Sequence, residues 1–314
     1  MSFVWNLCLL IIGFVLLIKG ADVFVEGASS IAAKFHIPQI IIGLTIVAFG
    51  TSAPEAAVSI SAAVKGNAGI AVGNILGSNI LNILLILGVT ACIHALNVQE
   101  STVKFDIPLV LLSSMVLSVC GLTTGHLNKV TGLILWAIFI VFFIHLIKEA
   151  KQGAQEDSEE SQIGHKKNLL VLILVTIAGL IAIVWGSNLA VDGATGVAKM
   201  LGMSDRLIGL TIVAFGTSLP ELITSAMAAK KGNCDIAVGN IVGSNIFNIL
   251  FVLGTTALIV DVPYGMDYLV DSIMCIASVV LLFLCIIKDK KISKKEGITM
   301  LAVFAAYYVY LIMK

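Results

Sequence analysis

Long apolar runs alternate with short polar segments along almost the whole chain. A helix that crosses a bilayer needs about 20 predominantly apolar residues, so each long run predicts one membrane-spanning helix. The ten predicted helices cover residues 5–27, 38–64, 69–93, 107–121, 129–148, 168–194, 205–229, 234–258, 266–287 and 297–313. Glycine, serine or proline interrupts several runs in mid-span, which a bilayer tolerates only where the freed backbone groups are buried in protein or line a polar cavity.

The composition supports this interpretation. Only 12% of the 314 residues are charged and 59% are hydrophobic, whereas soluble domains carry about 25% charged residues. Such a chain cannot cover a water-facing surface with polar groups, which excludes the soluble, fibrous and disordered classes. The formal net charge is zero, so nothing points to a nucleic-acid partner. We therefore expect an all-α integral membrane protein that crosses the lipid bilayer of the cell membrane many times.

The two halves of the chain repeat each other. Residues 43–90 align without a gap with residues 209–256, and 34 of the 48 aligned pairs are identical. The repeat divides the chain into a first five-helix repeat (1–148), an acidic linker (149–167) and a second five-helix repeat (168–314). Because five is an odd number, the second repeat begins on the opposite side of the membrane, and we expect the two repeats to be inverted.

Basic residues predict the orientation, because cytoplasmic loops of membrane proteins carry an excess of lysine and arginine. With the N-terminus outside, thirteen of the 19 lysine and arginine residues lie in the cytoplasm, five lie outside, and Lys19 lies within the first span. We predict that both termini face outside and that the linker 149–167 is cytoplasmic. The linker is too short to hold a folded domain, and we expect the chain to function as a monomer.

Two glutamates, Glu55 and Glu221, lie near the middle of their apolar runs and correspond to each other in the repeat. A charged side chain at that depth costs at least about 2.5–3.5 kcal/mol, so each needs a reason to be there. A single glutamate could be neutral and hydrogen-bonded. Two glutamates at matching positions, with matching polar neighbours and no basic residue in their own runs, instead indicate ligands of a cation.

Hydroxyl, amide and carbonyl groups surround both glutamates. Thr51 and Ser52 precede Glu55 by four and three residues, which places them on one helix face with it. Pro54 removes a backbone donor, so we expect a bend that frees carbonyl groups just before the glutamate. The next run of each repeat adds polar residues at steps of four, of which Asn74 and Asn240 are either ligands or packing groups. The candidate ligands are Ala48, Thr51, Ser52, Glu55, Ser78 and Asn82 in the first copy, and Ala214, Thr217, Ser218, Glu221, Ser244 and Asn248 in the second. All are oxygen donors, which suit sodium and calcium and do not suit zinc or copper.

The paired motifs resemble a known family. GTS-x-PE occurs twice, and each copy is followed by GN-x-x-GSN-x-x-N. This pattern is similar to the α-repeats of the sodium/calcium exchangers, in particular the prokaryotic type, within the calcium/cation antiporter superfamily. The resemblance covers nearly the whole chain and implies ten helices in inverted repeats that exchange sodium for calcium by alternating access.

The resemblance also implies individual roles. Glu55 and Glu221, with the carbonyls of Thr51 and Thr217, would hold calcium. Sodium would bind at two flanking sites, formed by Ala48, Ser78 and Asn82 and by Ala214, Ser218 and Ser244. One position departs from the family pattern, because many members have an aspartate where this chain has Asn248.

Charge arithmetic favours antiport independently of the family. Two glutamates neutralise one calcium ion or two sodium ions, and repulsion in a low-dielectric site disfavours binding both sets together. The leading interpretation is therefore a sodium/calcium antiporter that is not an enzyme and needs no cofactor beyond the transported ions. A calcium/proton antiporter is the nearest alternative, since glutamates also carry protons. A cation channel would lack mutually exclusive occupancy, and an intramembrane metal hydrolase would need a nucleophile or general base that no motif supplies.

Overall fold

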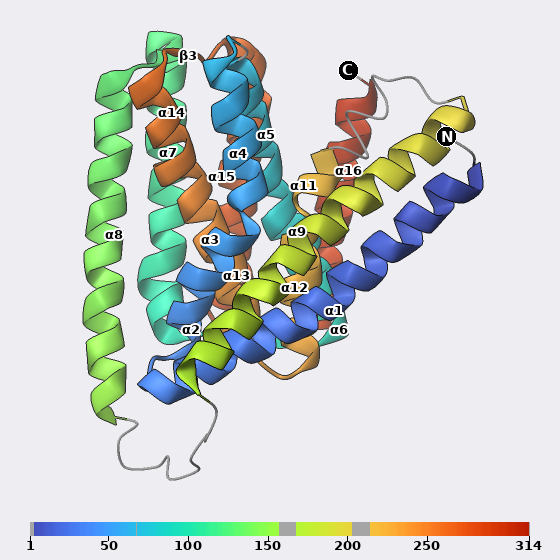
Figure 1. Ribbon diagram of the computed structural model, residues 1–314. Coiled ribbons are helices and arrows are strands. Elements are labelled where there is room, and N and C mark those ends of the chain that lie inside the picture. The colour runs from blue at the N-terminus through green and yellow to red at the C-terminus, as the bar shows by residue number, and fades with distance from the viewer. Residues whose placement is uncertain (1–2, 67, 157–167, 203–213, 314) are drawn as a thin grey trace.

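The computed structural model describes residues 3–66, 68–156, 168–202 and 214–313, and this part of the chain is almost entirely helical (Figure 1). The helices of the first half are α1 (Phe3–Phe35), α2 (Gln39–Ile42), η1 (Gly43–Val47), α3 (Ala48–Thr51), α4 (Ala53–Val64), α5 (Ala68–Leu81), η2 (Asn82–Leu87), α6 (Gly88–Ile93), η3 (Thr102–Asp106), α7 (Ile107–Thr124) and α8 (Lys129–Glu156). Those of the second half are α9 (Leu169–Met200), α11 (Ala214–Thr217), α12 (Leu219–Lys230), α13 (Cys234–Ile246), η6 (Phe247–Leu253), α14 (Gly254–Ile259), η7 (Met266–Tyr268), α15 (Leu269–Ile286) and α16 (Lys294–Met313).

Two short antiparallel strand pairs join loops of the two halves. Strand β1 (Leu96–Asn97) pairs with β4 (Lys291–Ile292), and β2 (His126–Leu127) pairs with β3 (Val262–Pro263). Each pair therefore ties a loop of the first repeat to a loop of the second.

Seven of the described helices are long and apolar enough to cross a membrane, or eight if the bent pair Gln39–Thr51 and Ala53–Val64 is one span. Helices occupy the ten predicted ranges as far as these are described; residues 205–213 and 157–167 lie outside the described residues. The helix predicted to end at residue 27 continues to Phe35. It continues because Ala28 and Ala32 are fully buried against the bundle, so packing rather than hydropathy sustains the last two turns.

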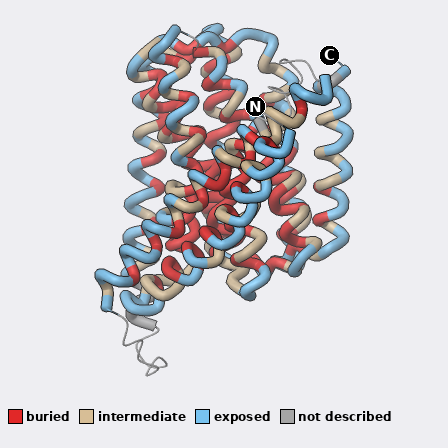
Figure 2. The backbone as a smooth tube through the Cα atoms, turned by 45° about the vertical axis from the view of Figure 1, so that its right-hand side comes forward, coloured by how far each residue is buried: buried red, intermediate tan, exposed pale blue. Residues whose placement is uncertain are grey.

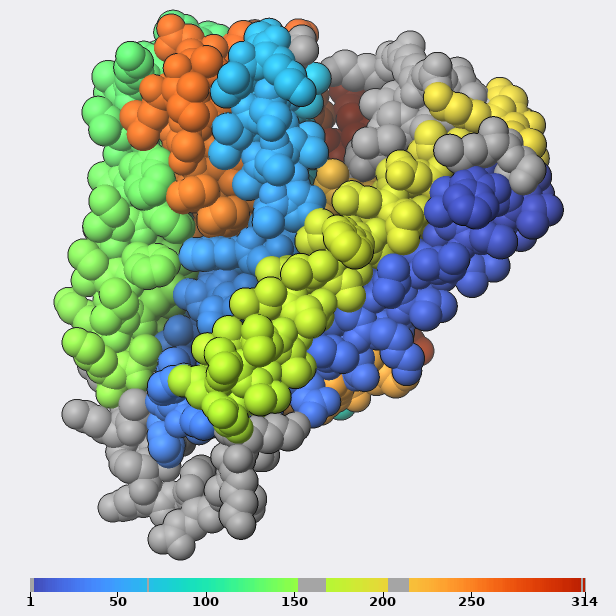
Figure 3. Space-filling view, in the orientation of Figure 1, coloured from blue at the N-terminus to red at the C-terminus, as the bar shows by residue number. Residues whose placement is uncertain are grey.

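Helices α1 and α9 lie side by side and cross one face of the molecule obliquely (Figures 1 and 3). They run antiparallel, because Gly13 approaches Ala190 while Gly27 approaches Thr176. Glycines recur every seven residues along the contact, and an added Cβ there would meet a facing atom at 3.0 Å or less. These glycines are Gly13, Gly20 and Gly27 on α1 and Gly179, Gly186 and Gly193 on α9. Small residues of this kind let two helix backbones approach closely in a bilayer.

The centre of the molecule is formed by α5 with η2 and by α13 with η6. Buried residues concentrate there, while the outward faces of α1, α8 and α9 are exposed (Figure 2). Every residue from Ile236 to Ile246 on α13 is buried, and that helix packs against η1, α3, α12 and η2. Exposed apolar side chains on the outer helices, such as Leu133, Leu174 and Leu284, suit a surface that faces lipid.

Candidate functional site

Both repeats break a helix immediately before the predicted glutamate. Between α3 and α4 the break falls at Ser52 (φ −82°, ψ 3°), and the helical segments on its two sides are bent by 48°. Between α11 and α12 it falls at Ser218 (φ −94°, ψ 5°). Pro54 and Pro220 cannot donate a backbone hydrogen bond, which accounts for the break at this point. The predicted bend before Glu55 is confirmed, and the second repeat breaks its helix at the corresponding residue.

Glu55 and Glu221 lie in the first turns of α4 and α12, and both are completely buried. Each accepts a hydrogen bond from a serine of the opposite repeat. Ser52 Oγ donates to Glu221 Oε1 at 2.9 Å, and Ser218 Oγ donates to Glu55 Oε1 at 3.3 Å. Among the described residues, no lysine, arginine or histidine forms an ion pair with either carboxylate. Both carboxyl groups therefore lie at the interface between the repeats, and each is hydrogen-bonded across it.

The serines of α5 and α13 extend this set of oxygens. Ser78 Oγ lies 3.2 Å from Ser218 Oγ, and Ser244 Oγ donates to Glu221 Oε1 at 3.3 Å. Ser52 and Ser244 are also hydrogen-bonded to each other. Hydroxyl groups from both repeats thus bridge the space between the two carboxylates.

Four asparagines lie beside the serines, where η2 and η6 begin. Asn82 Nδ2 donates to Asn245 Oδ1 at 2.9 Å, and Asn248 Nδ2 donates to Asn79 Oδ1 at 3.2 Å. Asn79 and Asn245 also donate to each other's backbone oxygen, both at 3.2 Å. Asn79 and Asn245 are not among the ligands predicted from the sequence, although both belong to the repeated GSN motif.

We call the two glutamates, with these serines and asparagines of both repeats, the ion cluster. Four of its oxygens have no hydrogen-bond donor. They are Glu55 Oε2, Glu221 Oε2, Asn82 Oδ1 and Asn248 Oδ1, and all four residues are completely buried. The amide nitrogens of the asparagines donate elsewhere, so their oxygens are left available. Buried polar atoms are nearly always paired, and each unpaired atom indicates a missing ligand or stored strain. Two carboxylate and two amide oxygens match the coordination that hard cations prefer.

The remaining predicted residues differ in what they offer. Thr51 Oγ1 lies 3.0 Å from both Val47 O and Asn240 Oδ1, so its one proton is shared between these two acceptors. Asn240 Nδ2 donates to Ser225 Oγ at 2.9 Å, and Asn74 Nδ2 to Ser59 Oγ at 3.0 Å. These two hydrogen bonds join α12 to α13 and α4 to α5. Both asparagines therefore act in helix packing, which is one of the two roles that the sequence leaves open for them.

The structure gives only the helix positions of the other three predicted residues. Ala48 is buried at the start of α3, and Ala214 and Thr217 bound α11. Within the described part of the chain, no three His, Cys, Asp or Glu side chains gather where they could hold a metal ion. The unpaired oxygens of the described cluster belong to two carboxyl groups and two side-chain amides, with serine hydroxyls beside them.

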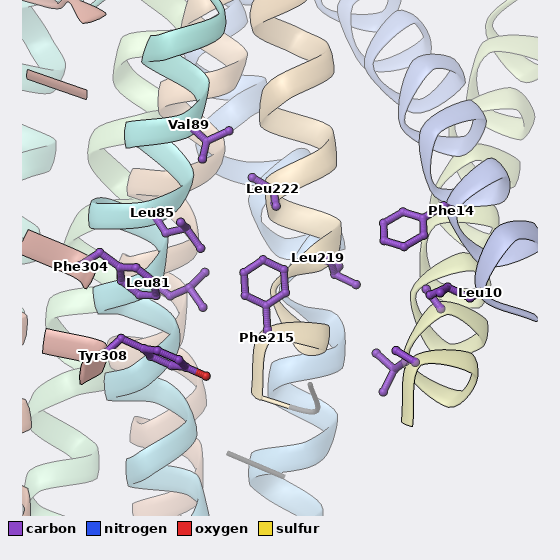
Figure 4. Close-up of a pocket in the computed structure, with 13 residues that line it drawn as sticks. Leu10, Phe14, Leu81, Leu85, Val89, Phe215, Leu219, Leu222, Phe304 and Tyr308 are labelled. Atoms are coloured by element: carbon purple, nitrogen blue, oxygen red, sulfur yellow. The ribbon is translucent and has the colours of Figure 1, made fainter. Parts of the chain in front are cut away.

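Two cavities lie near the cluster and differ in character. One of about 630 Å³ is lined by the first turns of α4, including Pro54, and by Asn188, Asp192 and Thr217. A second of about 550 Å³ is lined, apart from Tyr308, by leucine, phenylalanine, valine and alanine side chains of both repeats, which come mainly from α1, α5, α9, α12 and α16 (Figure 4). Because it offers no polar group but the Tyr308 hydroxyl, the second cavity does not suit a cation, whereas the first does.

An ion pair joins the end of α12 to α1. Lys231 Nζ contacts Asp22 Oδ1 at 2.7 Å and donates to the Asp22 backbone oxygen at 2.8 Å. At the same offset of 166 residues Asp22 corresponds to Asn188, which lines the polar cavity, and α12 packs directly against α1. The polar cavity thus lies beside α4 and α9, while the corresponding helices α12 and α1 are held together by this ion pair.

The fold and these buried oxygens define a multi-pass helical membrane protein of the cation-transporter class. A family model described as sodium/calcium exchanger protein matches residues 5–148 and 171–313. The chain belongs to this family of exchangers.

Relatives and solved structures agree with this assignment. The chain is 32% identical to "Sodium/calcium exchanger MaX1" of Methanosarcina acetivorans over 347 residues, covering 98% of each chain. It is 40% identical to "Putative antiporter CaxA" of Alkalimonas amylolytica over 307 residues, covering 95% of each. A solved structure of the sodium-calcium exchanger NCX_Mj, soaked without sodium and calcium, superposes with a TM-score of 0.85 at 34% identity and covers 99% of this chain and all of that one. Membership of the family establishes a cation antiporter of the calcium-exchanging kind.

Proposed function

We propose that the chain exchanges sodium for calcium across the cell membrane by alternating access. The observation that carries this proposal is the group of four buried oxygens without donors, on Glu55, Glu221, Asn82 and Asn248. Two carboxylates balance one calcium ion or two sodium ions. Because both sets of ions would use the same carboxylates in a buried site, binding of one set excludes the other, and this exclusion is what exchange requires.

Within this site we assign the ligands as follows. Calcium binds between Glu55 and Glu221 and the backbone carbonyls of Thr51 and Thr217. Sodium binds at flanking positions formed by oxygen donors of both repeats. These flanking donors are Ala48, Ser78 and Asn82 on one side, and Ala214, Ser218 and Ser244 on the other, with Ser52 and Asn248 completing the cluster. The hydrogen bonds that link serines of one repeat to glutamates of the other support a shared site.

The proposed architecture is ten transmembrane helices in two inverted five-helix repeats, 1–148 and 168–314, joined by the linker 149–167. Two observations support it. Helices α1 and α9 correspond in the repeat alignment and run antiparallel. Asn79 and Asn245, which also correspond, make reciprocal hydrogen bonds, as a two-fold axis between the repeats would produce. Such an axis lies in the membrane plane when the repeats are inverted.

We further propose that both termini lie outside and that the linker is cytoplasmic. With this orientation the polar cavity beside α4 and α9 opens to the outside, and the Lys231–Asp22 contact closes the cytoplasmic side. The structure then corresponds to an outward-facing state in which the ion-binding side chains are still buried. The chain is proposed to act as a monomer, because the whole ion cluster comes from one chain.

Proton coupling is the second candidate, because two buried carboxylates without basic partners can also bind protons. Flux into proteoliposomes separates the two. We expect radioactive calcium to enter vesicles loaded with sodium at equal pH, and not vesicles loaded with potassium or choline. Calcium uptake that follows an imposed pH gradient in sodium-free buffer would identify a calcium/proton antiporter instead.

A further inference from the structure

Two asparagines of the ion cluster, Asn79 on α5 and Asn245 on α13, use both ends of their side-chain amides, and both are completely buried. Asn79 Nδ2 donates to the backbone oxygen of Asn245, and Asn79 Oδ1 accepts from Asn248 Nδ2, both at 3.2 Å. Asn245 Nδ2 donates to the backbone oxygen of Asn79 at 3.2 Å, and Asn245 Oδ1 accepts from Asn82 Nδ2 at 2.9 Å. We call these four residues the asparagine quartet. They form two matching chains of hydrogen bonds that cross between the repeats.

Each chain of hydrogen bonds starts at a group that can play only one part. A backbone oxygen accepts and cannot donate, so the side chain bonded to it must turn its amide nitrogen towards it. This leaves the amide oxygen of Asn79 facing Asn248 and that of Asn245 facing Asn82. An amide oxygen also only accepts, so Asn248 and Asn82 must turn their nitrogens towards it. The chains end at Asn248 Oδ1 and Asn82 Oδ1, which have no donor among the described residues.

The orientation of these last two amides matters because the two ends of an asparagine amide are alike in size and opposite in polarity. The oxygen offers the lone pairs that a hard cation binds, whereas the NH₂ group offers only hydrogens. Packing cannot choose between two orientations of nearly equal shape, but hydrogen bonds can. The other acceptor of Asn82 Nδ2 is Ser244 Oγ at 3.4 Å, and a hydroxyl also donates, so it does not fix the orientation.

We propose that Asn79 and Asn245 are positioning residues for cation binding, which hold the amides of Asn248 and Asn82 with their oxygens towards the ion. The proposal rests on the proposed function, since it takes Asn82 and Asn248 as ligands of the transported cations. Replacing a group that orients a metal ligand typically lowers metal affinity by about 10–100-fold. Each positioning residue belongs to one repeat and its ligand to the other, so the ion site is complete only when α5 and α13 lie together.

The melting temperature of purified full-length variants tests the proposal, because an ion that binds the folded state raises the melting temperature as its concentration rises. Asn79→Ala and Asn245→Ala should each increase the sodium or calcium concentration needed for a given rise by about tenfold or more. In calcium uptake, the half-saturating ion concentrations should increase while the maximal rate changes much less. Thr90→Ala and Thr256→Ala are matched controls at corresponding, completely buried positions, where each hydroxyl donates to a backbone oxygen of its own helix. Both controls should bind cations as the wild type does.

A second substitution separates positioning from packing. The carboxylate of the Asn248→Asp variant has an oxygen at both ends, so its orientation no longer matters, and many family members have an aspartate there. In this background Asn79→Ala should cause no further loss of cation affinity. A loss that persists undiminished would show that Asn79 acts through packing, and cation affinities unchanged in both single alanine variants would also overturn the proposal.

Two further measures keep the test decisive. Asn79→Ser and Asn245→Ser keep a polar group but lack the amide oxygen, and they replace the alanine variants if these do not fold. Wild-type calcium uptake that needs no sodium would refute the proposed function instead. The melting temperatures with calcium would still decide whether the asparagine quartet positions its ligands, because they do not depend on transport.

Discussion

At the scale of single residues, the ion cluster is costly unless an ion occupies it. Leaving a buried donor or acceptor unpaired costs about 1–3 kcal/mol, and more for a charged group. Glu55 and Glu221 add mutual repulsion to that cost. Calcium or sodium relieves both terms, so bound ions should stabilise the fold as ligands of the native state do.

Neutralising either glutamate should abolish calcium transport and leave a folded protein. Glu55→Gln or Glu221→Gln keeps the size of the side chain but leaves calcium with one carboxylate instead of two. We expect a loss of calcium uptake of at least about 100-fold, which corresponds to a loss of at least about 2.8 kcal/mol in the free energy of ion binding. Uptake into proteoliposomes measures this, with size-exclusion chromatography as the check on folding and Glu100→Gln as the control carboxylate. Near-normal uptake by either variant would show that the substituted glutamate is not a calcium ligand.

The sequence identifies some of these residues and not others, for physical reasons. A glutamate in an apolar run stands out because burying its charge is expensive. A second glutamate at the matching position of the repeat favours a cation ligand over a neutral, hydrogen-bonded acid. Asn79 and Asn245 do not stand out, because spacing alone cannot tell which of several neighbouring amides donates to which.

At the scale of helices, the contact between α1 and α9 depends on glycine. Gly186 faces the backbone of Leu17, and an added Cβ would lie 2.6 Å from its nitrogen. Gly77 on α5 instead has open space around the position of a Cβ. The hydrophobic pattern predicts both helices, but not how closely they pack. The close approach of their backbones depends on glycines, which add nothing to the hydrophobic pattern.

We therefore expect Gly186→Ala and Gly77→Ala to have opposite effects on stability. Gly186→Ala forces backbones apart, and overpacking of this kind costs about 1–3 kcal/mol. Gly77→Ala should be neutral or stabilising by up to about 1 kcal/mol, because alanine favours a helix over glycine. The melting temperatures of the detergent-solubilised variants measure the difference. Equal melting temperatures would show that α1 and α9 do not pack as tightly as the glycines indicate.

The loops that follow α6 and α15, which are joined by the β1–β4 strand pair, carry a pH-dependent contact. Glu100 lies between Lys104 and Lys290, and hydrogen bonds to these two ammonium groups lower its pKa from the usual 4.5 to about 2. A carboxyl whose folded-state pKa is lowered stabilises the fold above its unfolded pKa and loses this contribution as the pH falls. The contribution should therefore be constant above about pH 4.5 and disappear between about 4.5 and 2.

Glu100→Gln tests this window. The variant should melt slightly below the wild type at neutral pH, since exposed ion pairs contribute little. The gap between the two melting temperatures should narrow as the pH is lowered below about 4.5. High salt should narrow the gap at neutral pH as well, because it screens exposed charges. A gap that stays constant from pH 7 to 3 would mean that the three side chains do not interact in solution.

At the scale of the whole molecule, the inverted arrangement fixes which loops share a side of the membrane. Gln155 and Lys291 should face the cytoplasm, while Lys65 and Lys199 should face outside. Single cysteines at these four positions, in a background without the six native cysteines, should differ in their reaction with a membrane-impermeant thiol reagent on intact cells. Reaction is expected at positions 65 and 199 only. Equal labelling at all four positions would contradict the inverted repeats, and the reverse pattern would contradict only the orientation.

The charge of the ion cluster also decides how the exchanger responds to voltage and to potassium. Asn82 and Asn248 offer oxygens without charge, and so no additional carboxylate is present to hold potassium. We expect calcium exchange that requires sodium, does not require potassium, and moves one net charge if three sodium ions exchange for one calcium ion. Moving one charge across 100 mV changes the driving force by about 2.3 kcal/mol, a large effect on flux. Potassium gradients with valinomycin set the vesicle potential, and a separate series without valinomycin, with choline replacing potassium, tests the potassium requirement. Initial sodium-driven calcium flux that does not change with voltage would exclude the three-for-one exchange and leave two sodium ions per calcium, and flux that stops in choline would refute the inference from the two asparagines.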